Sequence, residues 1–154
     1  MRYAMISGLA LCALATQAIP QKTAARKIPC KTPEIAASCY WTHGRLSLYN
    51  GNPSLRLWKV GTKRILGVYS GPHSERYDPL DNEHPELPAN LDRAYDAEYK
   101  RRLALKDRDA GLPEPSFGDF EVCPLEPEHP GRMQSVCIEA VKNIFIQRVG
   151  AARR

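Results

Sequence analysis

The chain has 154 residues, which is enough for one domain and not comfortably for two. Its formal net charge is +5, and much of the excess lies near the two ends, between residues 22 and 31 and from residue 148 to residue 154. We interpret these basic ends as solvated termini, and we do not expect nucleic acid as the partner.

The first fifteen residues have the three parts of a secretory signal peptide. The basic residue Arg2 precedes an apolar run over residues 4–14, and the small residues Ala13 and Ala15 form an A-x-A exit. The run is shorter than the roughly 20 apolar residues that span a bilayer. We predict cleavage after Ala15, or alternatively after Ala18, and a periplasmic or secreted protein without a transmembrane segment in the mature chain. An uncleaved amphipathic anchor is the alternative.

Removal of the leader would leave four of the five cysteines. An even number in an oxidising compartment predicts two disulfides, and four thiolates binding zinc are the alternative. Cys123 and Cys137 lie equally far from a Pro-Gly turn, so a hairpin folding there would place them opposite each other. We therefore predict the disulfide Cys123–Cys137 and, by default, Cys30–Cys39. We expect no cofactor.

The mature chain divides by composition into three parts. Residues 16–38 are small, polar and basic with three prolines, and they predict a flexible basic arm. Residues 39–149 predict a single β-rich domain, and residues 150–154 a basic tail.

The domain opens with three short runs rich in β-branched, leucine and aromatic residues, over residues 41–49, 54–60 and 64–69. Strong turn signals separate them, at residues 50–53 and at Gly61-Thr62. This pattern predicts a three-stranded meander.

The two turns agree about which side chains face inward. A two-residue type II′ turn at Gly61-Thr62 places Leu57 opposite Leu66, and a four-residue loop between the first two runs places Leu48 opposite Leu55. A slip of one residue in either hairpin would break this agreement. The inward face of the meander is then made of aliphatic side chains: Leu46, Leu48, Leu55, Leu57, Leu66 and Val68.

A helix is predicted over residues 90–106, with Asn90 as its N-cap. Its apolar stripe recurs every four residues: Leu91, Tyr95, Tyr99 and Leu103. Two more strands follow, over residues 117–124 and 134–147. In the last strand Lys142-Asn143 predicts a bulge, and one face is apolar: Val136, Ile138, Ala140, Ile144 and Ile146.

This order of elements predicts a mainly β fold with one helix. It matches a small five-stranded OB-like barrel or meander sheet, with the helical insert at 90–106 between strands 3 and 4. An open α+β sandwich, with the helix on one sheet face, is the alternative.

The outer face of the meander is the predicted binding surface. It combines aromatic and arginine side chains, with Ile65 beside them and Gly67 leaving a shallow spot. The alternative is that the helix packs on this face and that Trp58 belongs to the core. The candidate binding residues are Arg45, Tyr49, Arg56, Trp58 and Tyr69.

Two other groups could carry chemistry. His43 is a possible base with Asp119 or Glu121, although no spacing in the sequence brings them together, and no hydrolase, phosphate-loop or redox motif occurs. We therefore predict no catalytic residue and lean against an enzyme. An acidic loop follows the meander, and we interpret it as solvated rather than as a metal site. Its candidate ligands are His73, Glu75, Asp78, Asp81, Glu83, His84 and Glu86.

Several stretches resemble a family of uncharacterised secreted bacterial proteins. The stretches are WTHGRL at 41–46, NGNP at 50–53, GTKRILGV at 61–68, FEVCP at 120–124 and VCIE at 136–139. The resemblance covers the strand-rich parts, supports one domain over residues 39–149, and implies no activity.

We therefore expect a non-enzymatic envelope or secreted module that binds a protein or a glycan. The alternatives are a small metal-dependent or hydrolytic periplasmic enzyme, and a module that binds oligosaccharide or nucleic acid on an OB-like face.

Overall fold

The computed structural model describes residues 26–73, 84–111 and 113–148. The predicted leader, the outer part of the basic arm and the basic tail lie outside the described residues.

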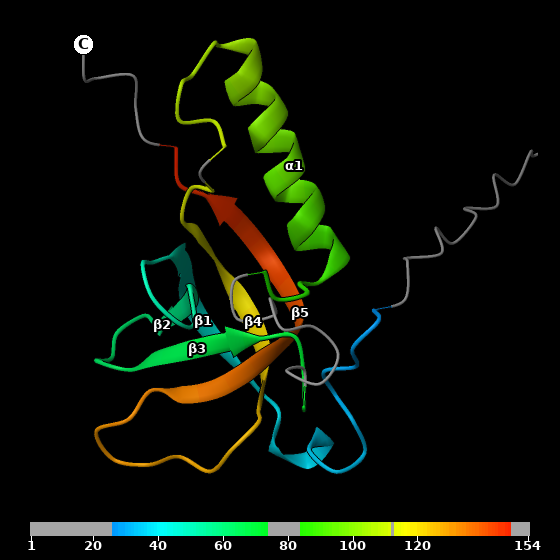
Figure 1. The fold of residues 1–154 in the computed structure, drawn as a ribbon. Helices are drawn as coiled ribbons and strands as arrows, with labels where there is room; N and C mark the ends of the chain where they lie inside the picture. The colour runs from blue at the N-terminus through cyan, green and yellow to red at the C-terminus, as the bar shows by residue number, and fades with distance from the viewer. Residues whose placement is uncertain (1–25, 74–83, 112, 149–154) are drawn as a thin grey trace, which may run out of the picture.

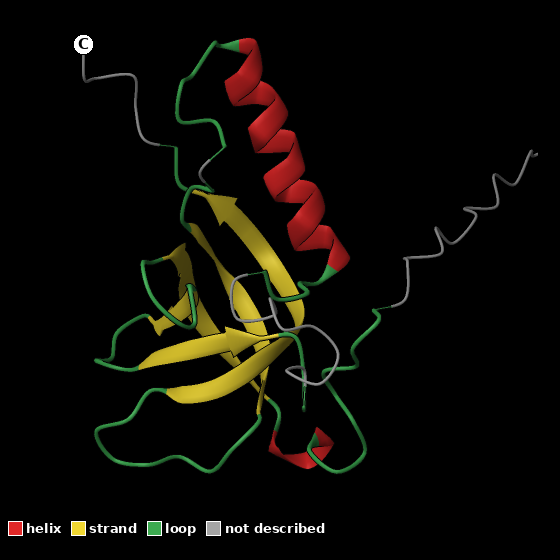
Figure 2. Cartoon of the chain, in the orientation of Figure 1, coloured by secondary structure: helices red, strands yellow, loops and turns green. Residues whose placement is uncertain are grey.

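The described chain contains five strands and one α-helix, close to the predicted runs (Figures 1 and 2). A short 3-10 turn, Ala36–Ser38, precedes the first strand. In chain order the elements are β1 (Tyr40–Leu48), β2 (Leu55–Lys59), β3 (Ile65–Tyr69), α1 (Ala89–Ala104), β4 (Ser116–Pro124) and β5 (Gln134–Ile146).

The strands form a closed barrel in the order β1-β2-β3-β5-β4, and β1 completes the circle by pairing with β4. The pair of β3 and β5 is parallel, and the other four pairs are antiparallel. The helix lies in the connection between β3 and β4. The OB-like barrel with its helical insert is confirmed, and the open sandwich is wrong.

Both hairpins of the meander have the predicted register. Leu48 lies opposite Leu55, Leu46 opposite Leu57, and Leu57 opposite Leu66. Two independent turns thus place the same leucines inside the barrel, which is why their agreement in the sequence was informative.

The second turn of the meander is wider than predicted. The amide of Thr62 donates to the carbonyl of Lys59 at 3.1 Å, and the amide of Lys59 donates to the carbonyl of Arg64 at 3.0 Å. Gly61, with φ 80°, is the third residue of the Lys59–Thr62 turn rather than the first central residue of a two-residue loop. The type II′ assignment is wrong, yet the register holds because both geometries leave Lys59 opposite Arg64.

The predicted inward side chains are buried in the barrel, with one exception. Leu48 is 44% exposed because it lies at the end of β1, where it borders a hollow at the mouth of the barrel. Phe120, Val122, Val136 and Ile138 complete the core from the opposite side.

Closure of the barrel requires two glycines that lie opposite each other, Gly44 on β1 and Gly118 on β4. A Cβ on Gly44 would lie 2.5 Å from Cδ1 of Leu57, and one on Gly118 would lie 3.0 Å from the carbonyl oxygen of Lys142. At these positions the neighbouring strands approach too closely for a larger side chain.

The predicted irregularity in β5 is present, and Asn143 has the positive φ of 52°. The register between β4 and β5 shifts at Asn143, and it shifts a second time nearer the start of β5. At this second shift Val122 pairs with Ile138 but its neighbour Glu121 pairs with Ala140, which leaves one residue of β5 unpaired. This second shift places Val141 inside the barrel and Ala140 outside, so the prediction that Ala140 shares the face of Val136 and Ile138 is wrong.

Only the first half of the predicted apolar stripe of the helix is packed against the core. Leu91 is fully buried and Tyr95 contacts the core, whereas Tyr99 and Leu103 are exposed. Asn90 is not the N-cap, since the helix begins at Ala89 and the Asn90 amide donates instead to the carbonyl of Val141 at 2.8 Å. This bond ties the start of α1 to β5, the strand against which the helix packs (Figure 1).

The described part of the predicted flexible arm, residues 26–38, is fixed to the barrel. Arg26 donates to the carbonyls of Ile138 and Ser70, each at 2.5 Å. The carboxylate of Glu86 accepts the amide of Ile28 at 2.9 Å, and Ile28 is buried. The composition did not reveal these contacts because they join the arm to distant parts of the sequence.

Two disulfides are present, but the predicted pairing is wrong. Cys30 is bonded to Cys137, and Cys39 is bonded to Cys123. Cys123 and Cys137 do lie opposite each other on β4 and β5, as the hairpin argument required. The sulfurs of Cys123 and Cys137 nevertheless each bond to a cysteine of the N-terminal segment. This segment lies beside β4 and β5, so its two cysteines are alternative partners for Cys123 and Cys137.

Candidate functional site

Three of the side chains on the outer face of the meander lie in one row. Arg45 is opposite Trp58, and Trp58 is opposite Ile65. The helix packs against β5 and does not lie over this row. The alternative in which α1 covers Trp58 is therefore wrong. Trp58 is half-buried and its indole NH donates to the carbonyl of Thr62 at 2.7 Å, which fixes the ring.

The centre of this face is filled, contrary to the predicted shallow spot at Gly67. A Cβ at Gly67 would lie 2.7 Å from Cγ of Pro53 and 3.4 Å from Cε of Met133. The β1–β2 loop and the chain entering β5 therefore meet above β3. In OB-fold proteins the loops that join β1 to β2 and β4 to β5 flank the ligand, so this contact closes the usual binding position.

Tyr49 and Arg56 hold the β1–β2 loop in place. The guanidinium of Arg56 lies 5.1 Å from the centre of the Tyr49 ring, and its Nε donates to the carbonyl of Pro53 at 3.0 Å. Tyr69 lies beyond Gly67 on β3, separated from Trp58 by the covered position. Of the five predicted binding residues, the structure thus brings Arg45 and Trp58 together, and separately Tyr49 and Arg56.

The row of Arg45 and Trp58 continues onto β4 and β5, which the sequence analysis missed. Phe117 lies opposite Arg45, and Phe145 lies opposite Phe117 with 6.5 Å between the ring centres. Phe145 is 62% exposed. Phe117 is two residues before the polar Asp119 and therefore shares its outward face. Only the pairing of β1 with β4, however, brings Phe117 beside Arg45.

A polar cluster of His43, Asp119 and Asn143 lies next to this row. His43 and Asp119 are opposite each other on β1 and β4, with 2.9 Å between Nδ1 and Oδ1. The Asn143 amide donates to Oδ2 of Asp119 at 2.7 Å. The hydrogen bond from Asn143, and then that from His43, holds the pKa of Asp119 below its ordinary value.

The sequence left the partner of His43 open between Asp119 and Glu121, and the structure pairs it with Asp119. Glu121 lies opposite Trp41 and pairs with the ammonium of Lys31 at 2.6 Å. In the part of the chain that is described, no hydroxyl or thiol is hydrogen-bonded to the His43 ring. The cluster therefore provides an oriented imidazole without a protein nucleophile.

Trp41 flanks the cluster on the side away from Phe117. It is 43% exposed, and the ammonium of Lys142 lies 4.1 Å from the centre of its ring. We call this surface the β1–β4–β5 face, and define it by the side chains that it presents: Trp41, His43, Phe117, Asp119, Lys142, Asn143 and Phe145.

The acidic loop offers little for a metal in the described residues. Glu75, Asp78, Asp81 and Glu83 lie outside them. Glu86 binds the N-terminal segment, and His84 borders the hollow at the mouth of the barrel. The close group of potential ligands in the described chain consists of Cys30, Cys123 and Cys137, all of which are in disulfides.

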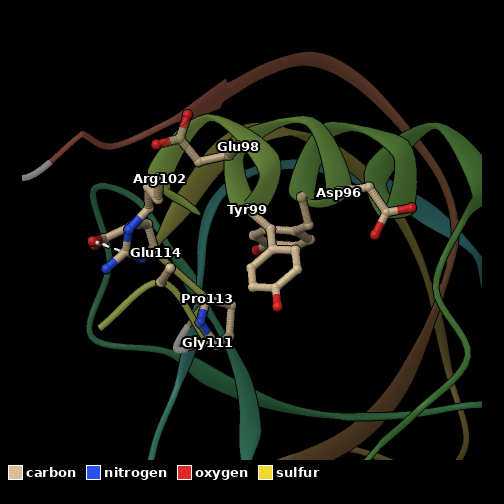
Figure 3. Close-up of a pocket in the computed structure, with 9 residues that line it drawn as sticks. Asp96, Glu98, Tyr99, Arg102, Gly111, Pro113 and Glu114 are labelled. Atoms are coloured by element: carbon tan, nitrogen blue, oxygen red, sulfur yellow. Dashed lines mark ion pairs between the residues drawn. The ribbon is translucent and has the colours of Figure 1, made fainter. Parts of the chain in front are cut away.

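Hollows of about 140, 270 and 500 Å³ border the helix. The smallest lies between the end of α1 and the chain before β4 (Figure 3). One side of its charged wall is an ion-pair network, because Arg102 pairs with Asp107 at 2.6 Å and with Glu114 at 3.1 Å, and Asp96 and Glu98 also line the hollow. We assign this network to fixing the helix end rather than to a ligand.

None of the described helices is long and apolar enough to cross a membrane. No protein-family model, no curated protein and no solved structure matches the chain.

Proposed function

We propose that the chain is an exported, non-enzymatic binding module that holds an oligosaccharide on its β1–β4–β5 face. One observation carries the proposal: an exposed, hydrogen-bonded cluster of His43, Asp119 and Asn143 lies between aromatic side chains on both sides. Two disulfides support export, because such bonds persist in oxidising compartments.

The spacing of the strands gives this face a suitable size. Outward side chains repeat about every 6.8 Å along a strand, and neighbouring strands lie about 4.8 Å apart. The outward positions from Trp41 to Arg45 and from β1 to β5 therefore cover roughly 13 by 10 Å. This area accommodates a short oligosaccharide.

The chemistry of the face matches the two surfaces of a sugar ring. The apolar C–H side of the ring packs on an aromatic face, for which Trp41 and Phe145 are exposed. The hydroxyl groups need fixed donors and acceptors, and the Asp119 carboxylate, the Asn143 amide and the imidazole supply both kinds. Because each polar group is held by its neighbour, little freedom is lost on binding.

The charge of the face disfavours a polyanion. Lys142 lies opposite Asp119, Glu121 pairs with Lys31 at the edge of the face, and Arg45 adds a single further cation at the other end. A phosphate backbone requires an uninterrupted basic groove, and its binding weakens steeply with salt. Binding to this face should depend little on salt.

A hydrolase is the second candidate, because the contact between His43 and Asp119 orients an imidazole as in a general base. In that function His43 would activate water, and the ligand would be cleaved rather than only bound. The same glycan assay separates the two candidates, since hydrolysis releases shorter sugars.

The test measures binding to purified peptidoglycan by co-sedimentation and to a panel of soluble hexose oligosaccharides by calorimetry. Trp41→Ala and Phe145→Ala should each weaken binding by about two- to twelvefold, the loss expected for one aromatic contact of about 0.5–1.5 kcal/mol. Leu103→Ala is the matched control, because Leu103 is 50% exposed on the far half of the helix. The melting temperature of each variant monitors folding.

Unchanged binding in both aromatic variants would contradict the proposed face. A wild-type chain that binds none of these glycans, but retains a protein partner through the same two aromatic residues, would reject the oligosaccharide. Released sugar that disappears in His43→Ala would replace the binding module with the hydrolase.

A further inference from the structure

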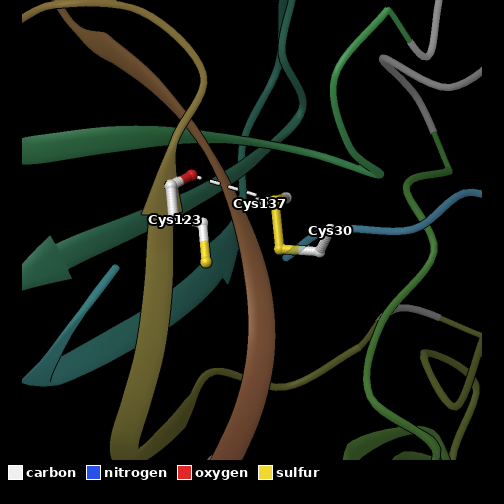
Figure 4. Close-up of side chains that lie close together, drawn as sticks. All are labelled: Cys30, Cys123 and Cys137. Carbon is white, nitrogen blue, oxygen red and sulfur yellow. Dashed lines mark hydrogen bonds between the residues drawn. A yellow bond between two sulfur atoms is a disulfide. The ribbon is translucent and has the colours of Figure 1, made fainter. Parts of the chain in front are cut away.

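The four cysteines of the barrel lie in one cluster although they form two separate bonds. Cys123 on β4 and Cys137 on β5 are opposite each other in the ladder. The sulfurs of Cys30, Cys123 and Cys137 all lie within 4.8 Å of one another (Figure 4). Opposed residues of an antiparallel pair are at a separation that a disulfide can span. A third bond, Cys123–Cys137, is therefore within reach of the sulfurs already present.

The two existing disulfides differ in access. Cys30, Cys123 and Cys137 are fully buried, whereas Cys39 is partly exposed at the start of β1. Cys39–Cys123 is therefore the bond that a thiol from solution can approach, at Cys39, and attack there would release the sulfur of Cys123. The buried disulfide Cys30–Cys137 is shielded from direct attack but lies next to the released sulfur.

We propose that these cysteines form a thiol–disulfide exchange site whose co-reactant is an external dithiol. The dithiol attacks Cys39, and its second thiol resolves the mixed disulfide, so that the dithiol is oxidised and Cys39 and Cys123 become thiols. The Cys123 thiolate then attacks the sulfur of Cys137. The Cys30–Cys137 bond breaks, the Cys123–Cys137 bond forms, and the Cys30 thiolate takes up a proton.

The exchange transfers the covalent link from the N-terminal segment to the barrel. Before it, residues 30 and 39 are both bonded to the β4–β5 pair. After it, the pair is bonded to itself, and the N-terminal segment is held by Arg26, the amide of Ile28 and its other noncovalent contacts. One two-electron reduction thus frees the segment from both bonds. This inference does not depend on the proposed glycan.

The test follows disulfide connectivity by peptide mapping in a chain carrying Cys12→Ser. Trypsin separates the four cysteines into the peptides 28–31, 32–45, 109–132 and 133–142. Cys39→Ser leaves a free Cys123 thiol, and Cys30→Ser leaves a free Cys137 thiol. Both variants should yield the linked peptides 109–132 and 133–142 after incubation at mildly alkaline pH and trapping with iodoacetamide. The control Cys39→Ser/Cys123→Ser should retain only the link between 28–31 and 133–142.

The wild-type sulfurs supply a second measurement that does not require the variants to fold. After reduction with a limiting amount of dithiothreitol and trapping with iodoacetamide, Cys30 and Cys39 should be alkylated and Cys123 should be linked to Cys137. Alkylated Cys39 and Cys123, with Cys30–Cys137 intact, would overturn the proposal. So would single variants in which the original disulfide is kept and the free thiol is alkylated quantitatively.

Discussion

Removal of the disulfide Cys39–Cys123 gives the most direct test of the long-range architecture. The bond joins residues 84 positions apart. In the chain-entropy treatment a loop of this length stabilises the folded state by about 4.6 kcal/mol, whereas a loop of about ten residues, as in the sequence-predicted Cys30–Cys39, gives only about 2.7 kcal/mol. In this chain, however, the intact Cys30–Cys137 bond already joins residues 39 and 123 through the short segments 30–39 and 123–137. The loop that Cys39–Cys123 adds is therefore only about 23 residues long, and Cys39→Ala/Cys123→Ala should lose about 3.4 kcal/mol of unfolding free energy.

Equilibrium urea unfolding without reductant measures this loss, with every chain carrying Cys12→Ser. The partner variant, Cys30→Ala/Cys137→Ala, opens the same short ring while Cys39–Cys123 stays intact, and it should also lose about 3.4 kcal/mol. Each double variant should show no free thiol when denatured, because its second disulfide is intact. Two free thiols per chain would refute the pairing, and a loss below about 2 kcal/mol would refute the entropic reasoning.

Two further predictions concern the barrel wall. Gly44→Ala should destabilise the fold by about 1–3 kcal/mol, because the new methyl group would meet the buried Leu57. The control Gly111→Ala has no atom near its Cβ position, so its stability should stay within about 0.5 kcal/mol of the wild type. Equal melting temperatures of the two variants would contradict the close approach of β1 and β2. The hydrogen bonds of Asp119 lower its pKa in the folded state, so their stabilising effect is complete above the unfolded value of about 3.9 and is lost as the pH falls through the folded value. Below about pH 3.9, the unfolding free energy should therefore fall less steeply with decreasing pH in Asp119→Asn than in the wild type, and parallel curves would contradict the assigned hydrogen bonds.

The meander could be predicted because its rules are local. Side chains alternate with a period of two, and a turn fixes the register of the strands that it joins. These local rules place Leu46, Leu57 and Leu66 on the same face without any information on long-range pairing. The turn at Gly61 shows the limit, since two turn geometries share one register and the sequence did not distinguish them.

The candidate site could be predicted only in part. Arg45 and Trp58 come from neighbouring strands of one hairpin, and their proximity followed from the register. His43 and Asp119 are 76 residues apart, and Phe117 and Phe145 join the row only through the closure of the barrel. Local sequence patterns also could not predict that Pro53 and Met133 cover Gly67.

The sequence by itself determined the strands, the helix, the inward face of the meander and the order that matches an OB-like barrel, because these follow from periodicity and turn chemistry along a short stretch of chain. The tertiary structure alone decided which cysteines are bonded, where the N-terminal segment lies and which polar side chains meet on the β1–β4–β5 face. The reason is physical: these contacts join segments that are distant in the chain, and their partners compete for positions that only the closed barrel defines.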